Sequence, residues 1–132
     1  MWKIKKVCNR NMKKRQYIYT ITCLYDIPPY CDNSLSRLER KKKTKEYWSH
    51  GGNRTVGWCK KPEDAKNIVE NNQCDIHECS YKYVVIEKVV DGVYGSRIGN
   101  CEQWYEWNET ENKYTPIDKP EKLKRIIGFS IG

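Results

Sequence analysis

Long apolar runs are missing from this sequence of 132 residues. A membrane-spanning helix needs roughly 20 consecutive apolar residues, and no stretch approaches that length. The basic start, MWKIKK, is not followed by the apolar segment of a secretory signal. We therefore expect a cytoplasmic protein without a membrane partner. Histidine is also scarce, with two residues, so each of them stands out as a candidate for chemistry.

Internal repeats, linkers and low-complexity tracts are absent too, and the length fits a single domain over residues 1–132. Aromatic residues are plentiful, with ten Tyr and five Trp, which is enough bulk for a small core and argues against disorder. Residues 1–14 are weakly patterned, and we expect them to be frayed. Residues 30–53 are expected to form a long basic connection.

Positive charge is concentrated in the first half of the chain. Residues 1–61 hold 16 Lys and Arg against 4 Asp and Glu, whereas residues 62–132 hold 9 against 13, and the whole chain carries +8. A cationic half attracts nucleotides, nucleic acid and acidic proteins. The alternative is a solvated basic face. The densest basic stretch, residues 40–45, lies in SLSRLERKKKTKEY, which is expected to form a short helix with Ser34 or Ser36 as N-cap.

The pattern of apolar residues predicts an α+β fold, with one mostly antiparallel sheet and two short helices packed on it. Residues 81–90 are apolar on both faces and should be central, while one face of such a sheet can stay open to solvent. Seven cysteines in a chain without a signal favour free thiols, with Cys23 and Cys59 as apolar fillers. The expected strands are 15–25, 54–60, 81–90, 101–108, 113–116 and 126–131, with a frayed strand at 2–8, and the expected helices are 62–72 and 119–125.

Five short segments of the second half of the chain form a recognisable series: GNRTVGW at 52–58, DIHE at 75–78, YVVIE at 83–87, WYEW at 104–107 and KPE at 119–121. They resemble a group of small uncharacterised proteins of low-GC bacteria and their phages, over roughly residues 52–132. The resemblance implies a phage-associated, cytosolic accessory protein, and it implies no activity and no site residues. Frequent Lys, Asn, Ile and Tyr, which have AT-rich codons, agree with such a source.

Two features predict a binding site for a phosphate-containing ligand. The turn from His50 to Arg54 contains two glycines, whose backbone N–H groups can approach a phosphate, and an arginine that can bind it with two donors. Aromatic rings beside Arg and Lys can stack on a base. The alternatives are a plain turn and rings that only fill the core. The expected ligand-binding residues are His50, Gly51, Gly52, Arg54, Trp58, His77, Trp104 and Trp107.

The polar run from Cys74 to Cys79 offers two further interpretations. Cys74, His77 and Cys79 could supply three zinc ligands, with Cys59 or His50 as a fourth, but the spacing matches no standard finger and no second CxxC follows. Asp75, His77 and Glu78 could instead serve a small hydrolase as general base and orienting group. We expect neither, and predict no metal, no cofactor and no catalytic residue.

The function expected from these features is non-catalytic. A phage-type counter-defence protein would bind and sequester a nucleotide signal of the cyclic nucleotide or cyclic ADP-ribose class, as a homo-oligomer in the host cytosol. One alternative is a basic inhibitor that binds nucleic acid or protein through residues 40–45, although no known nucleic-acid motif is present. A further alternative is the small hydrolase. The first expectation requires the cations, the rings and the glycine turn to converge on one surface.

Overall fold

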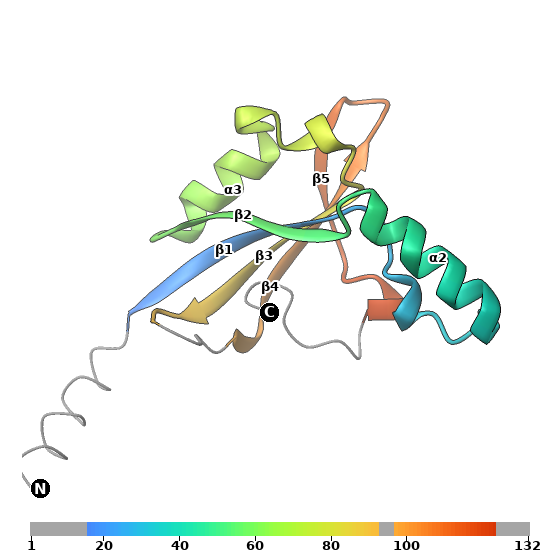
Figure 1. Ribbon diagram of the computed structural model, residues 1–132. Coiled ribbons are helices and arrows are strands. Elements are labelled where there is room, and N and C mark those ends of the chain that lie inside the picture. Colours follow the sequence, from blue (N-terminus) through green and yellow to red (C-terminus); the bar gives the residue numbers. More distant parts are fainter. Residues whose placement is uncertain (1–15, 93–96, 124–132) are drawn as a thin grey trace, which may run out of the picture.

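A five-stranded antiparallel sheet, in the order β2-β1-β3-β4-β5, organises the chain in the computed structural model, which describes residues 16–92 and 97–123 (Figure 1). The expected α+β fold is confirmed. The strands are β1 (Tyr17–Leu24), β2 (Asn53–Cys59), β3 (Tyr83–Val90), β4 (Arg97–Asn108) and β5 (Lys113–Ile117). The helices are α2 (Arg37–Ser49) and α3 (Pro62–Glu70), with short 3-10 segments η1 (Pro29–Cys31), η2 (Gln73–Cys79) and η3 (Glu121–Leu123).

The central position of β3 follows from its sequence. Tyr83 to Glu87 are all buried, as expected for a strand that is apolar on both faces. Along β1 the pleat sends alternate side chains to opposite faces, so that Ile21 and Leu24 enter different cores. β2 is an edge strand whose register with β1 shifts between Ile21 and Thr22.

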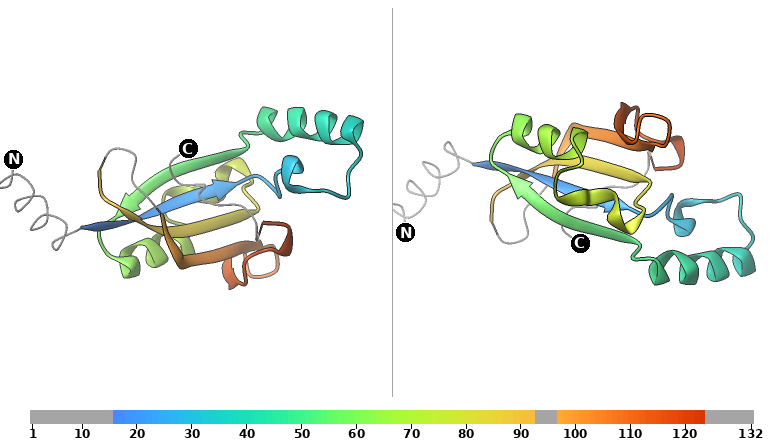
Figure 2. Two further views of the ribbon diagram at one scale, coloured as in Figure 1. Left: turned by 90° about the horizontal axis from the view of Figure 1, so that it is seen from below. Right: turned by 90° about the horizontal axis from the view of Figure 1, so that it is seen from above.

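Both faces of the sheet carry a core, so neither face is open as a whole. One core lies under α3 and contains Ile21, Cys23, Ala65, Val69, Tyr81, Val84, Ile86, Tyr105 and Tyr114. The second lies on the other face and contains Leu24, Tyr83, Val85, Trp104 and Leu123. Figure 2 shows α3 and α2 at different places around the sheet: α3 lies across it, and α2 extends beyond it.

The two helices differ in how they are held. α3 begins at Pro62 with acidic residues in its first turn, as the sequence predicts, and buries Ala65 and Val69 against the sheet. α2 is capped by the Ser36 hydroxyl, which accepts a hydrogen bond from the Glu39 N–H, and it buries only Tyr47. Residues 30–53 therefore contain a helix that projects from the domain (Figure 1).

Some expectations differ from the structure or lie outside it. The helix expected over 119–125 is, within the described residues, a 3-10 turn at Glu121–Leu123. The strands expected at 2–8 and 126–131 lie outside the described residues. Cys23 is buried and free, and Cys59 packs partly buried against the same core, as expected of apolar fillers. None of the helices among the described residues is long and apolar enough to cross a membrane.

Candidate functional site

In the glycine turn that follows α2, the backbone N–H groups form hydrogen bonds within the protein. Gly51 and Gly52 have φ angles of +97° and +55°, a conformation that favours glycine. The Gly51 N–H donates to the Trp48 carbonyl at 3.1 Å and the Gly52 N–H to the Tyr47 carbonyl at 2.9 Å. These donors satisfy the last carbonyls of α2 and are not directed at an anion. The turn therefore ends a helix, which was the plain alternative to a phosphate-binding loop.

His50 and Arg54, which flank the two glycines, contact different parts of the protein. The His50 ring stacks on Tyr25, with centroids 4.7 Å apart and planes 15° apart. Arg54 lies exposed on β2, where its positive charge partly offsets the effect of burial, which raises the pKa of Tyr81. His50 and Arg54 thus leave the turn without forming a joint anion site.

The expected aromatic residues are divided between the two faces of the sheet. Trp104 is 2% exposed in the core opposite α3. Trp107 lies on the α3 side, where the His77 ring stacks on it at 3.6 Å with planes 6° apart. Trp58, on the edge strand β2, is 58% exposed. Of the eight expected residues, the structure stacks His77 on Trp107, whereas Trp104 lies in the opposite core, Trp58 is exposed on the edge strand, and the glycine donors of the turn bond to α2. The expected convergence of cations, rings and glycine turn on one surface is therefore not found among the described residues.

The run from Cys74 to Cys79 forms the kinked segment η2, in which Cys74 and Asp75 have positive φ angles. The Asp75 carboxylate accepts from Asn72, and the His77 ring meets Trp107. Nothing among the described residues places the imidazole against Asp75 or Glu78 as a general base requires. Within residues 16–92 and 97–123, no three His, Cys, Asp or Glu side chains gather as a metal site would need.

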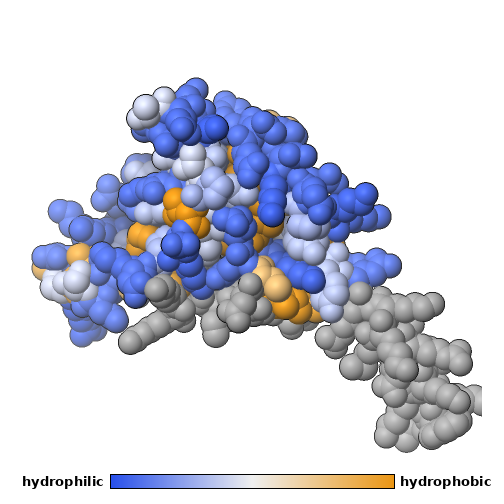
Figure 3. Space-filling model, turned by 180° about the vertical axis from the view of Figure 1, so that it is seen from behind, coloured by the Kyte–Doolittle hydropathy of each residue, from blue (hydrophilic) through white to orange (hydrophobic). Residues whose placement is uncertain are grey.

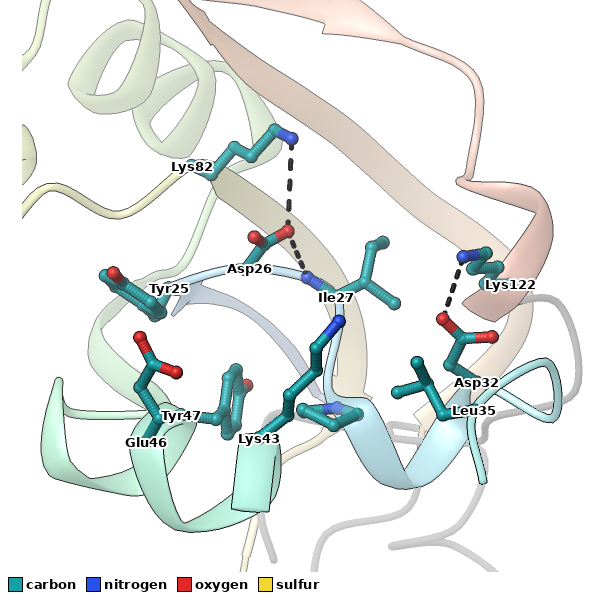
Figure 4. Close-up of a pocket in the computed structure, with 11 residues that line it drawn as sticks. Tyr25, Asp26, Ile27, Asp32, Leu35, Lys43, Glu46, Tyr47, Lys82 and Lys122 are labelled. Carbon is teal, nitrogen blue, oxygen red and sulfur yellow. Dashed lines mark hydrogen bonds and ion pairs between the residues drawn. The ribbon is translucent and has the colours of Figure 1, made fainter. Parts of the chain in front are cut away.

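A pocket of about 470 Å³ opens where α2, η1 and the end of β1 meet. Figure 4 shows its lining side chains converging from these elements, from Lys82 just before β3, and from η3. Nine of its eleven lining residues belong to residues 1–61, the half of the chain that carries the excess positive charge. The lining residues are Tyr25, Asp26, Ile27, Pro29, Asp32, Leu35, Lys43, Glu46, Tyr47, Lys82 and Lys122.

Three ammonium groups and three carboxylates border this pocket. Lys122 donates to Asp32 at 2.9 Å, and Lys82 lies 3.9 Å from Asp26. Hydrogen bonds from Ser34 and Lys122 lower the pKa of Asp32 to about 2. Partial burial alone lowers the pKa of Lys82, but the nearby negative charges, chiefly that of Asp26, raise it overall. The Asp32 carboxylate and the Lys82 ammonium are therefore charged at neutral pH.

Tyr47 combines deep burial with an unsatisfied hydroxyl. It is 2% exposed, and its ring lies edge-on to Tyr25 with centroids 6.5 Å apart. Its hydroxyl is buried and has no hydrogen-bond partner among the described residues. Burial raises the pKa of Tyr47, so that the group stays a neutral hydroxyl able to donate and accept. Buried polar groups are nearly always satisfied, and Tyr47 is one of a few exceptions among the described residues and borders the pocket.

Burial makes two of the described cysteines, Cys31 and Cys23, poor nucleophiles. Burial raises the pKa of the Cys31 thiol to about 11. The buried Cys23, on the other side of the sheet, has a pKa of about 12 for the same reason. The thiolate is the reactive form of cysteine, so both groups are unreactive near pH 7.

None of the eight residues expected to bind a ligand lines this pocket, although the sequence contained a signal for it. Asp26 follows the strand that ends at Leu24, and Lys82 precedes the strand that starts at Tyr83. In an antiparallel pair the end of one strand lies beside the start of the other, and Leu24 does pair with Tyr83. The charges of Asp26 and Lys82 therefore meet where β1 ends and β3 begins.

Comparisons with known proteins do not assign the chain to a family. A scan against protein-family models found no match, and neither a search of curated proteins nor one of solved structures found a match.

Proposed function

We propose that this protein is a non-catalytic binding protein that holds a small phosphate-containing ligand of the nucleotide class in the pocket between α2, η1 and η3. The observation that carries the proposal is the Tyr47 hydroxyl, which is buried at the pocket without a partner among the described residues. An unsatisfied buried group costs about 1–3 kcal/mol, and a ligand atom that bonds to it recovers that stabilisation.

The charges around the pocket match the parts of a nucleotide. Ammonium groups of Lys43 and Lys82 suit a phosphate, which lysine binds as a point charge. Carboxylates such as Glu46 accept hydrogen bonds from sugar hydroxyls, as an acidic residue does in dinucleotide sites. The Tyr25 ring offers an aromatic edge for a base. The volume of about 470 Å³ lies within the range of small-molecule sites, roughly 300–1,000 Å³.

The absence of an activated group in the described pocket lining favours capture over turnover. Cys31 beside the pocket is held as a thiol by its raised pKa, and His77 stacks on Trp107 and does not line the pocket. We propose that the ligand is released unchanged. Sequestration of a cyclic nucleotide or cyclic ADP-ribose signal in the cytoplasm of a bacterial host, as a phage counter-defence, is the setting that the sequence resemblance favours. We propose that the protein acts as a homo-oligomer, in which a second copy of the chain covers the open pocket.

The test begins with protein purified as the full chain. Its melting temperature is measured with cyclic dinucleotides, cyclic trinucleotides and cyclic ADP-ribose isomers, and with inorganic phosphate and nucleosides as controls. We expect one of the nucleotides to raise the melting temperature, because a ligand that binds only the folded state stabilises it. Mass spectrometry of the supernatant after heating should show the ligand intact. Release of a hydrolysed product would point to an enzyme, and no shift with any nucleotide would reject the proposal.

A further inference from the structure

The helix α2 is held to the domain by one side only. It has 13 residues, of which Tyr47 alone is buried. Figure 1 shows it extending past the end of the sheet, and Figure 3 shows a surface on which hydrophilic residues predominate and apolar ones form small separate patches. A helix that is polar almost all round is not explained by packing on a core.

The outward side of α2 has a defined composition. With 3.6 residues per turn, Tyr47 and the pocket residue Lys43 lie on the side that faces the domain. Leu38, Lys41, Lys42 and Lys45 lie on the opposite side, and all four are exposed. We call these four residues the outer face of α2. Leu38 is 81% exposed, whereas Trp48 lies on the flank of the helix, where its ring packs on Tyr47 with centroids 5.3 Å apart.

Repulsion in α2 is local to its outer face. Arg37 with Lys41, and Lys41 with Lys45, are like charges at a spacing of four residues, which destabilise a helix by a few tenths of a kcal/mol per pair. Glu39 with Lys43, and Lys42 with Glu46, are opposite charges at the same spacing and offset this cost for the helix as a whole. A partner that supplies negative charge would relieve the repulsion at Lys41 and Lys45, and an apolar recess in it would cover Leu38.

We propose that the outer face of α2 docks on an acidic protein surface that has an apolar recess, in the manner of a helix laid into a groove. Leu38 would anchor the contact, and the three lysines that follow it on the same face would meet carboxylates. Charge complementarity alone would also suit a nucleic acid. Leu38 favours a protein partner over a nucleic acid, because a phosphate backbone offers no apolar surface to this side chain, the most exposed apolar one of the helix.

The test uses the full chain and a defined probe. The probe is a synthetic amphipathic helical peptide with a leucine stripe bordered by glutamates, compared with a scrambled peptide of equal charge and with duplex DNA and RNA. The first variant is Lys41→Gln/Lys42→Gln/Lys45→Gln, because glutamine keeps helix propensity. Its matched control is Lys60→Gln/Lys61→Gln/Lys66→Gln, which makes the same change of net charge at exposed lysines outside α2. A third variant is Leu38→Gln, whereas Trp48 is left intact because its ring packs against Gly52.

We expect the first variant to weaken peptide binding about tenfold or more and the control to change it by less than about twofold, because binding depends on the charges at the contact and not on the net charge. Leu38→Gln should weaken it about fivefold or more, and the scrambled peptide should bind less well. Binding that depends equally on both lysine sets, or not at all on Leu38, would overturn the proposal. So would tighter binding of DNA or RNA with a steep dependence on salt. Lys43 is unchanged in every variant, so nucleotide binding in the pocket is tested separately.

Discussion

Lys82 and Asp26 place their Nζ and Oδ1 atoms 3.9 Å apart at the pocket, one just before β3 and the other just after β1. Charge-assisted hydrogen bonds are shorter, at about 2.7–2.9 Å. The Lys82 ammonium is therefore near a carboxylate without being tightly bound to it, and it can turn toward a phosphate at small cost. Lys122, at 2.9 Å from Asp32, is held more firmly and shapes the pocket wall.

Removal of the Tyr47 hydroxyl should affect stability and binding in opposite directions. In Tyr47→Phe we expect the free energy of unfolding to stay the same or rise by about 1 kcal/mol, because an unsatisfied buried group is lost. Nucleotide affinity should fall about tenfold, the equivalent of one hydrogen bond. Urea unfolding and calorimetric titration measure the two effects.

The matched control for this change is Tyr114→Phe. The Tyr114 hydroxyl donates to the Tyr81 carbonyl at 2.7 Å, so its removal should lower stability by about 1 kcal/mol. It should leave nucleotide affinity unchanged, since Tyr114 does not line the pocket. If Tyr47→Phe lost as much stability as Tyr114→Phe and bound the ligand normally, the Tyr47 hydroxyl would have a partner within the protein.

Asp32 should make stability depend on pH in the acid range. Its pKa is about 2 in the folded protein, against an ordinary value of 3.8. As the pH falls from about 4 to about 2, the unfolded chain binds a proton at Asp32 before the folded one does, so the stabilisation present above pH 4 is lost. Asp32→Asn should therefore flatten the fall of the urea midpoint over this range. Glu109→Gln, in the exposed turn between β4 and β5, is the control and should retain the slope of the unchanged protein.

Glycine is required at position 52 but not at position 57. A Cβ atom on Gly52 would lie 2.4 Å from the Trp48 ring, at a φ of +55° that side chains rarely adopt. Gly52→Ala should thus cost about 1–3 kcal/mol of stability. At Gly57 a Cβ would meet nothing within 4 Å, so Gly57→Ala should change stability by less than about 0.5 kcal/mol. Equal thermal stability of the two variants would contradict the role of Gly52 in ending α2.

His77 should matter for stability and not for turnover. Its ring stacks on Trp107 at 3.6 Å and lies edge-on to Tyr114, so His77→Ala should lower the free energy of unfolding by about 1 kcal/mol. Its neighbour Glu78 is exposed, and Glu78→Gln serves as the control, with no change expected. A variant that kept full stability but lost a nucleotide-hydrolysing activity of the unchanged protein would instead support the hydrolase alternative.

Local patterning was sufficient to predict much of the fold. Alternation in residues 17–24, the two-sided apolar run around Val84 and Val85, and Pro62 at the start of α3 are signals that depend on neighbours in the chain. The helix expected over 119–125 shows the limit. Pro120 and Glu121 favour a helical start, but within the described residues the chain makes one 3-10 turn that buries Leu123 in the core opposite α3.

The candidate site was less predictable because it depends on which segments meet. Trp104 and Trp107 are three residues apart in an extended strand, so they point to opposite faces and cannot share a ligand. Tyr47 gave no sign in the sequence that its hydroxyl would be buried. That property arises only when η1 and the end of β1 pack beside α2.

Calorimetric titration of the nucleotide panel into the unchanged protein and into Lys43→Gln/Lys82→Gln tests the central claim most directly. The control, Lys60→Gln/Lys66→Gln, removes the same charge from exposed positions outside the pocket. We expect one nucleotide to bind the unchanged protein and the control, and to bind the pocket variant about 100-fold more weakly, as for two charge-assisted contacts of about 1.4 kcal/mol each. Equal affinity for the pocket variant and the control, or no binding of any nucleotide to the unchanged protein, would contradict the account.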